Sequence, residues 1–182
     1  MQKALILIDV QNDYFAGGAM PLARMEEAAH NCRRLLEGFR SRNLPVIHVQ
    51  HLSVREGATF FIPGTPGCDI HGSVAPGENE KCLSKHYPNA FRETGLEAYL
   101  RRQKIDELVI CGAMSHMCID TSVRAAFDLG YPCTVIADAC ATRELDFSGR
   151  KVAAEDVHAA FMAALSLPFA TILTTTEFLP GL

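Results

Sequence analysis

The chain has 182 residues, of which 48% are hydrophobic and 21% are charged, and its formal net charge is −4. A length of about 100–200 residues is typical of one domain, so we expect a single domain over residues 1–182. The composition is that of a globular protein and excludes a largely disordered chain. The slight negative charge argues against a nucleic-acid-binding protein, which usually carries a basic face.

The sequence contains seven cysteines and no tryptophan. No two cysteines have the C-x-x-C spacing, so neither a zinc ribbon nor a thioredoxin motif is predicted. The first apolar run, residues 4–8, is too short for a signal peptide, and no run reaches the roughly 20 residues that span a bilayer. We therefore expect a cytoplasmic protein without a membrane partner, in which most of the thiols are small buried hydrophobes.

Strands and helices alternate along the chain. In chain order we expect a strand at residues 4–9, a helix at 25–41, strands at 45–50 and 81–85, a helix at 91–103, a strand at 107–112, a helix at 118–129, a strand at 132–138, a helix at 152–165 and a strand at 169–174. The expected strands are continuously apolar, which is typical of a parallel sheet covered on both faces. The pattern predicts an α/β fold, in which helices lie on both faces of a doubly wound open sheet.

A long stretch without periodicity, residues 52–79, is rich in glycine and proline. Irregular loops longer than about 12–15 residues are uncommon in compact domains and are often functional. In open α/β sheets the ligand lies beyond the carboxyl ends of the strands. Reactive side chains at these strand ends are therefore the candidates for a functional site.

Three strand ends carry such side chains. Asp9 ends the first strand, Lys85 ends the short strand at 81–85, and Cys118 follows the strand at 107–112 near the expected start of a helix. A helix N-terminus and a neighbouring cation both lower the pKa of a cysteine, so we predict that Cys118 is a thiolate nucleophile. Each residue also has a plainer interpretation: Asp9 as an acid that caps a turn, Lys85 as a solvated surface lysine, and Cys118 as a thiol packed in the core.

The sequence gives weaker support for a functional role of the histidines near these positions. His116 is close to Cys118 in sequence, but side chains two residues apart on a turn need not face each other. We interpret His116 as part of a pocket wall rather than as a base. His48 and His51 are three residues apart on a strand and so point to opposite faces. We predict neither a metal site nor a cofactor.

Several segments together resemble a known family. They are residues 5–15, 63–67, 85–91, 112–126, 128–131 and 138–140, followed by His158 and the strand at 169–174. Their order and spacing resemble those of the isochorismatase-like cysteine hydrolases. The resemblance implies a six-stranded, mainly parallel sheet of order 3-2-1-4-5-6 and a homo-oligomer of two or more chains.

The resemblance also implies the site and its reaction. The catalytic triad would be Asp9, Lys85 and Cys118. A cis peptide between Ala113 and Met114 would aim the N–H groups of Met114 and Cys118 at one point and form an oxyanion hole. Asp9 would take the thiol proton with the help of Lys85, and the thiolate would attack a small amide or related C–N substrate to form a thioester that water then hydrolyses.

The substrate itself stays open. The expected substrate-binding residues are Gln11, Phe15, Phe60, Phe61, Tyr87 and His116. Residues 48–52 lack the Asp-x-His pair of nicotinamidases, which argues against that identity and against a metal. Three alternatives remain: an isochorismatase-type vinyl-ether hydrolase, a thiol redox sensor based on Cys118, and a silent binding protein of the same fold.

Overall fold

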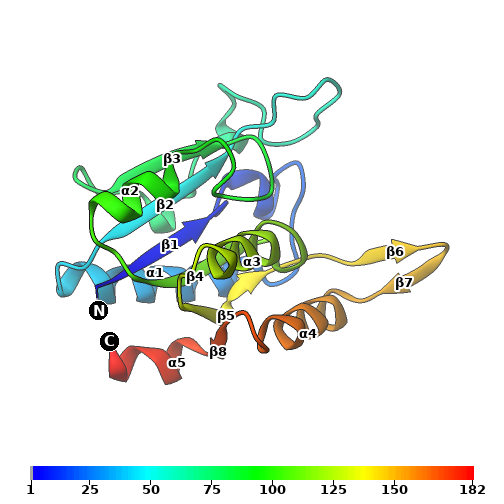
Figure 1. The fold of residues 1–182 in the computed structure, drawn as a ribbon. Coiled ribbons are helices and arrows are strands. Elements are labelled where there is room, and N and C mark those ends of the chain that lie inside the picture. Colours follow the sequence, from blue (N-terminus) through cyan, green and yellow to red (C-terminus); the bar gives the residue numbers. More distant parts are fainter. Residues whose placement is uncertain (1) are drawn as a thin grey trace.

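The computed structural model describes residues 2–182 and contains one six-stranded sheet of order β3-β2-β1-β4-β5-β8 (Figure 1). The strands are β1 (Lys3–Ile8), β2 (Val46–His51), β3 (Lys81–Lys85), β4 (Glu107–Ala113), β5 (Cys133–Ala141) and β8 (Thr171–Leu173). Every neighbouring pair is parallel. The predicted order 3-2-1-4-5-6 is confirmed, because β8 is the sixth strand of this sheet.

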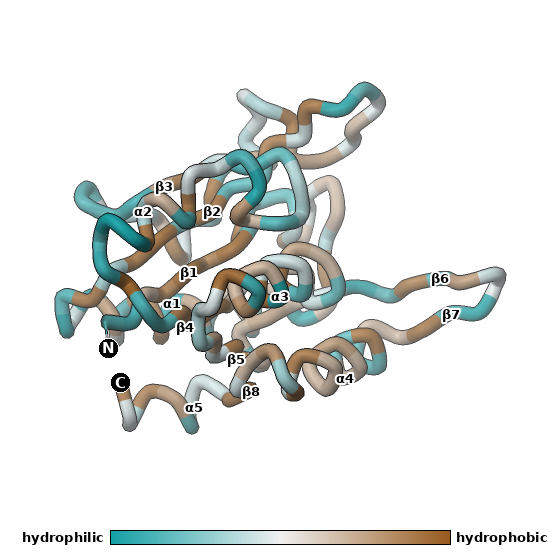
Figure 2. The backbone as a smooth tube through the Cα atoms, in the orientation of Figure 1, coloured by the Kyte–Doolittle hydropathy of each residue, from teal (hydrophilic) through white to brown (hydrophobic). Residues whose placement is uncertain are grey.

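Helices cover both faces of the sheet. They are α1 (Met25–Ser41), α2 (Leu96–Arg102), α3 (Asp120–Asp128), α4 (Ala154–Leu165) and α5 (Thr175–Phe178). Residues of α1 and α5 pack on one face, and residues of α2, α3 and α4 pack on the other. In β1, Leu5 and Leu7 face α1 while Ile6 and Ile8 face the opposite layer. Because both faces are covered, β1 is apolar from Ala4 to Ile8, as Figure 2 shows for this strand.

Three expected helices begin later than the sequence pattern indicates, and one of them is α4, which begins at Ala154 rather than at residue 152. The helix expected from residue 91 begins at Leu96, because Glu93 and Gly95 have φ angles of 59° and 72°, in the left-handed region. The helix expected from residue 118 begins at Asp120 and follows a π-helical turn, Ser115–Ile119. Cys118 lies within that turn.

Three short elements went unpredicted. The strands β6 (Leu145–Phe147) and β7 (Arg150–Val152) form an antiparallel hairpin that pairs with no other strand and extends from the body of the molecule (Figure 1). The third is α5. Each is too short to show a hydrophobic period. The strand expected at 132–138 runs on to Ala141, so Cys140 lies in a strand rather than in a loop.

The stretch 52–79 is irregular, as expected, and contains two short 3-10 turns, Pro66–Cys68 and Gly72–Val74. It is held by the segment that follows β1. The buried carboxylate of Asp13 accepts hydrogen bonds from the N–H groups of Phe61 (2.6 Å) and Ala19 (3.1 Å). None of the helices within residues 2–182 has both the length and the apolar character needed to cross a membrane.

Candidate functional site

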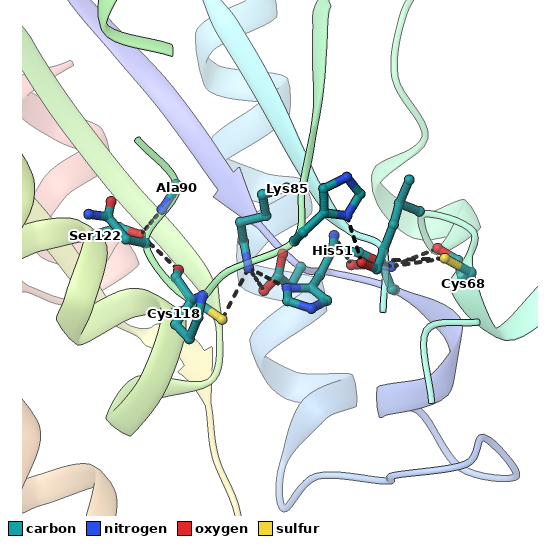
Figure 3. A network of polar contacts seen from close by, with 12 residues as sticks. His51, Cys68, Lys85, Ala90, Cys118 and Ser122 are labelled. Carbon is teal, nitrogen blue, oxygen red and sulfur yellow. Dashed lines mark hydrogen bonds and ion pairs between the residues drawn. The ribbon is translucent and has the colours of Figure 1, made fainter. Parts of the chain in front are cut away.

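Four neighbouring strands each deliver one polar side chain to the same edge of the sheet. Lys85 is the last residue of β3, His51 is the last residue of β2, Asp9 follows β1, and Cys118 follows β4. The register pairs His51 with Lys85 on adjacent parallel strands. Figure 3 shows the side chains of Lys85, His51 and Cys118 converging. The three predicted catalytic residues therefore meet, together with His51.

Lys85 lies at the centre of this group. Its Nζ atom is 2.8 Å from Asp9 Oδ2, 2.9 Å from His51 Nδ1 and 3.2 Å from Cys118 Sγ (Figure 3). An ammonium group has three N–H donors and no acceptor, so these three contacts use its full capacity. The side chain is buried, with 1% of its surface exposed.

The neighbours of Lys85 stabilise its protonated, positively charged form. Burial lowers the pKa of this ammonium, but the negative charge of Asp9 and the sulfur of Cys118 outweigh that effect, and the net change is upward. Lys85 is therefore cationic across the physiological pH range and supplies a fixed positive charge next to the thiol.

The pKa of the Cys118 thiol is raised, whereas its position in the sequence predicts a lowered pKa. Burial and the nearby Asp9 carboxylate raise its pKa, and the opposing effect of Lys85 is smaller. This direction favours a protonated sulfur at rest, and the thiolate nucleophile stays a prediction. Cys118 sits in the π-helical turn ahead of α3 and is only 5% exposed, and burying a charge in such a place is costly.

Asp9 has an unusual backbone and an unusual side chain. Its φ angle is 55°, in the left-handed region that aspartate tolerates better than most residues, and its N–H donates to Val49 O at 2.9 Å. The carboxylate is fully buried, and its Oδ1 atom has no hydrogen-bond partner within residues 2–182. Buried polar atoms normally have partners, so an acceptor left free beside a thiol is suited to receiving a proton.

The segment before Cys118 is held tightly. The Ala113–Met114 peptide bond is cis. The Ser115 hydroxyl contacts Ala141 O at 3.3 Å and His158 Nδ1 at 2.8 Å, which ties the turn to β5 and α4.

Gly112 precedes that segment in β4. Its φ angle is 121°, and a Cβ atom there would collide with the carbonyl oxygen of Ile8 in β1. Only glycine allows β4 to approach β1 in this way.

Two of the expected substrate-binding residues are committed to protein contacts. Gln11 is fully buried; its Oε1 accepts from His51 N (2.8 Å), and its Nε2 donates to His51 O (2.9 Å) and Cys68 O (2.7 Å). Phe15 is buried and stacks on His71, with 3.6 Å between ring centroids. Gln11 thus fixes the end of β2.

The other four make contacts with neighbouring side chains. Phe61 is buried between the rings of Phe60 and His51, with centroid distances of 5.0 and 5.9 Å. The Arg92 guanidinium lies 3.4 Å from the ring centroid of Tyr87. His116 Nδ1 is hydrogen-bonded to Thr142 Oγ1 at 2.6 Å, and its place in a pocket wall stays a prediction.

His51 is the residue that sequence reasoning missed. It was considered with His48 only as a metal ligand, and the two indeed point apart: His48 Nε2 is 2.8 Å from Glu80 Oε2, whereas His51 faces Lys85. The register of β2 against β3 was the signal that would have found it. The ligand atoms of Asp9, His51 and Cys118 lie within 4.8 Å of one another, but Lys85 Nζ contacts all three and occupies the place of an ion.

The centre is closed to solvent in this conformation, since Asp9, Lys85 and Cys118 are all buried. A separate cavity of about 340 Å³ lies between α1, β5 and α4, beside Cys140 and His158, and the three predicted catalytic residues do not line it.

Comparison with known proteins points to one family. The family model described as the isochorismatase domain matches residues 3–177. An uncharacterized isochorismatase family protein of Bacillus subtilis, YddQ, is 50% identical, over 98% of this chain and 99% of its own length. A solved structure from Oleispira antarctica, named as an isochorismatase hydrolase, has a TM-score of 0.95 and 49% identity over 99% of this chain and 97% of its own.

Two more distant relatives are named for their reactions. The nicotinamidase of Escherichia coli is 27% identical over 97% of this chain and 96% of its own length. The streptothricin hydrolase of Streptomyces noursei is 32% identical over 90% of this chain and 56% of its own length.

Proposed function

The chain belongs to the isochorismatase family, whose members are hydrolases, and from that membership we propose that it is a cysteine hydrolase of a small-molecule amide or related C–N bond. The observation that carries the proposal is the contact of one buried ammonium, Lys85, with both the Asp9 carboxylate and the Cys118 sulfur. Such a set supplies a nucleophile, a base and a fixed counter-charge. The nicotinamidase relative supports the class of bond.

The first step moves one proton and forms one bond. Because the pKa of Cys118 is raised, the thiol keeps its proton until a base removes it. Asp9 takes that proton as Sγ attacks the carbonyl carbon of the substrate, and Lys85 stabilises the sulfur as its negative charge develops. The carbonyl electron pair moves onto oxygen, and the N–H groups of Met114 and Cys118 donate to this oxyanion.

The second half releases the two products. The tetrahedral intermediate collapses, Asp9 returns the proton to the departing nitrogen, and a thioester remains on Cys118. Asp9 then takes a proton from water as the water oxygen attacks the thioester carbon. Collapse of this second intermediate releases the carboxylic acid and returns the proton to the sulfur.

A redox sensor is not favoured by the thiol positions. Cys32, Cys111 and Cys140 are the cysteines that lie close together: the contact with Cys32, burial and the nearby Cys140 raise the pKa of Cys111. Cys118 instead has Lys85 and Asp9 as its partners. A sensor of the usual kind needs a second thiol beside the reactive one.

The test is turnover on a panel of small amides, ureides and isochorismate, scored for ammonia and for pyruvate. We expect ammonia release by the wild type and a loss of more than about 1,000-fold in Cys118→Ala. Acid quenching during turnover, followed by mass spectrometry, should find the acyl group on the peptide that contains Cys118. Pyruvate from isochorismate would establish the vinyl-ether reaction instead, and near-normal turnover by Cys118→Ala would reject the nucleophile.

We further propose that the protein is a cytoplasmic homo-oligomer of two or more chains. Its seven cysteines are free thiols, as a reducing compartment keeps them. The β6–β7 hairpin pairs only with itself and leaves Phe147 79% exposed. An isolated two-stranded hairpin is only marginally stable in water, so a second copy of the chain packed against it would stabilise it.

A further inference from the structure

The mechanism above uses groups from three of the four strands that meet at the site. The fourth, β2, contributes His51, which lies between Lys85 of β3 and Asp9 of β1 in the order of the sheet. The imidazole is partly buried, and its Nδ1 atom contacts Lys85 Nζ at 2.9 Å. No step of the proposed reaction requires a histidine here, so its contact with the ammonium calls for another explanation.

The chemistry of the ammonium fixes the role of this imidazole. Lys85 donates and cannot accept, so His51 Nδ1 must be the acceptor and carries no proton. The ring proton of a neutral imidazole then sits on Nε2. Burial and the positive charge of Lys85 lower the pKa of His51 to about 4, and His86 adds to this effect while Asp9 opposes it. The ring is therefore neutral at physiological pH and remains an acceptor.

The backbone of His51 is held in place from both sides. The Gln11 amide bonds its N–H at 2.8 Å and its carbonyl oxygen at 2.9 Å, and the Phe61 ring lies against the imidazole. A side chain held in this way presents Nδ1 at a constant position. Gln11 and Phe61, both expected to bind substrate, thus support the residue that contacts Lys85.

We infer that His51 is a positioning residue, whose Nδ1 accepts one N–H of Lys85 so that the other two point at Asp9 Oδ2 and Cys118 Sγ. This inference rests on the proposed function. An uncharged acceptor suits the position, because a carboxylate would add a second negative charge beside the thiol and a cation would repel Lys85. Without His51 the ammonium has two partners for three donors, and its charge is no longer held against the sulfur.

The first test follows Cys118 without any substrate. The rate of alkylation by iodoacetamide is measured across pH, and the modified residue is located by mass spectrometry. His51→Leu has no acceptor at this position. In this variant we expect the midpoint of the alkylation profile to move to higher pH. Alkylation at pH 8 should slow roughly tenfold, because one hydrogen bond to a charged group is lost. In His51→Asn, whose Oδ1 can replace Nδ1, we expect most of the rate to return.

A matched control lies on the same strand. His48→Leu removes an imidazole three residues away that faces Glu80, and it should leave the alkylation profile unchanged. A wild-type profile in His51→Leu would overturn the inference, and so would a loss in His51→Asn as large as in His51→Leu. Equal shifts in His48→Leu and His51→Leu would also overturn it, since they would indicate a general effect on β2.

The second test needs no variant and so does not depend on folding of the mutants. In wild-type protein labelled with ¹⁵N-histidine, the Nδ1 and Nε2 shifts of His51 at pH 7 should be those of a neutral ring protonated on Nε2. A charged ring or a proton on Nδ1 would overturn the inference. The two proposals also fail separately: no turnover by the wild type rejects the function alone, whereas Cys118-dependent turnover that is unaffected in His51→Leu rejects the role of His51 alone.

Discussion

Asp9 and Lys85 act on the Cys118 thiol in opposite directions. The carboxylate raises the pKa of the thiol and the ammonium lowers it, and burial adds to the effect of the carboxylate. The base that the reaction needs is thus also the group that keeps the thiol protonated at rest. The reactivity of the thiol and the turnover of the enzyme should therefore separate when one of these charges is removed.

In Asp9→Asn we expect faster alkylation of Cys118 at pH 7 to 8, because the negative charge that raises its pKa is gone. Turnover should fall by roughly 100- to 10,000-fold, because the general base is lost. Lys85→Met is the opposite case, in which alkylation and turnover both slow. Iodoacetamide kinetics and ammonia release measure the two quantities, and slower alkylation in Asp9→Asn would contradict this account.

Glu80 should make the stability of the fold depend on pH. Its carboxylate binds Arg40 at 2.7 and 2.8 Å and His48 at 2.8 Å, and mainly through Arg40 its pKa falls from 4.5 to about 2. A lowered carboxyl pKa adds stability above about pH 4.5 that is lost as the pH falls toward 2. Glu80→Gln should remove roughly 2 kcal/mol at pH 7 and flatten this dependence.

The measurement for Glu80 is urea unfolding at a series of pH values. Glu97→Gln is the control, because Glu97 pairs with Arg101 on the exposed surface of α2. Exposed pairs of this kind contribute about 0.5 kcal/mol or less. Equal changes in the two variants would show that the contacts of Glu80 with Arg40 and His48 add no special stability.

Residue types at strand ends were enough to select Asp9, Lys85 and Cys118, because parallel strands bring their carboxyl ends together. The protonation state of Cys118 could not be predicted from the sequence, because it depends on burial and on the distance to Asp9. The contact of His51 with Lys85 was missed for a similar reason. Its role follows from the register of β2 and β3, two strands about 30 residues apart in the sequence, and no local pattern encodes that register.

At the scale of elements, one buried hydroxyl joins the loop that follows Lys85 to the helix that follows Cys118. Ser122 in α3 is buried, and its Oγ accepts from Ala90 N at 2.9 Å (Figure 3). The two halves of the site are thereby fixed relative to each other.

Ser122→Ala should leave the Ala90 N–H buried without a partner, which costs about 1–3 kcal/mol. We expect a lower Tm and reduced turnover, because the loop beside Lys85 loosens. Ser166→Ala is the matched control, since its hydroxyl bonds Ala163 O on the exposed end of α4. Thermal unfolding that does not distinguish the two variants would argue against a linking role for Ser122.

The long helix α1, which has a clear period, has its expected bounds, and so does the short strand β3. Errors occurred where the backbone takes a special conformation. The left-handed residues Glu93 and Gly95 delay α2, and the π-helical turn at Ser115–Ile119 delays α3. Such conformations arise from tertiary packing, which hydrophobic spacing does not report.

At the scale of the whole molecule, the proposed oligomer depends on the β6–β7 hairpin. We expect light scattering to give the mass of at least two chains for the wild type and a lower mass for Phe147→Ser. Leu167→Ser is the control, because this side chain is 81% exposed but lies outside the hairpin. A monomeric wild type would reject the oligomer, and equal effects of both substitutions would place the interface elsewhere.

The sheet order was predictable because the motifs resemble a family with a known topology, and the hairpin was not because its strands have three residues each. Asp9, His51, Lys85 and Cys118 follow one another along the chain, yet across the sheet they lie in the order Lys85, His51, Asp9, Cys118. Pairings between distant segments form slowly during folding. A nascent chain therefore holds an ordinary cysteine, and the surroundings that shift its pKa form only when β3, β2, β1 and β4 have paired. In refolding experiments, the alkylation profile of Cys118 would report on the assembly of the sheet core.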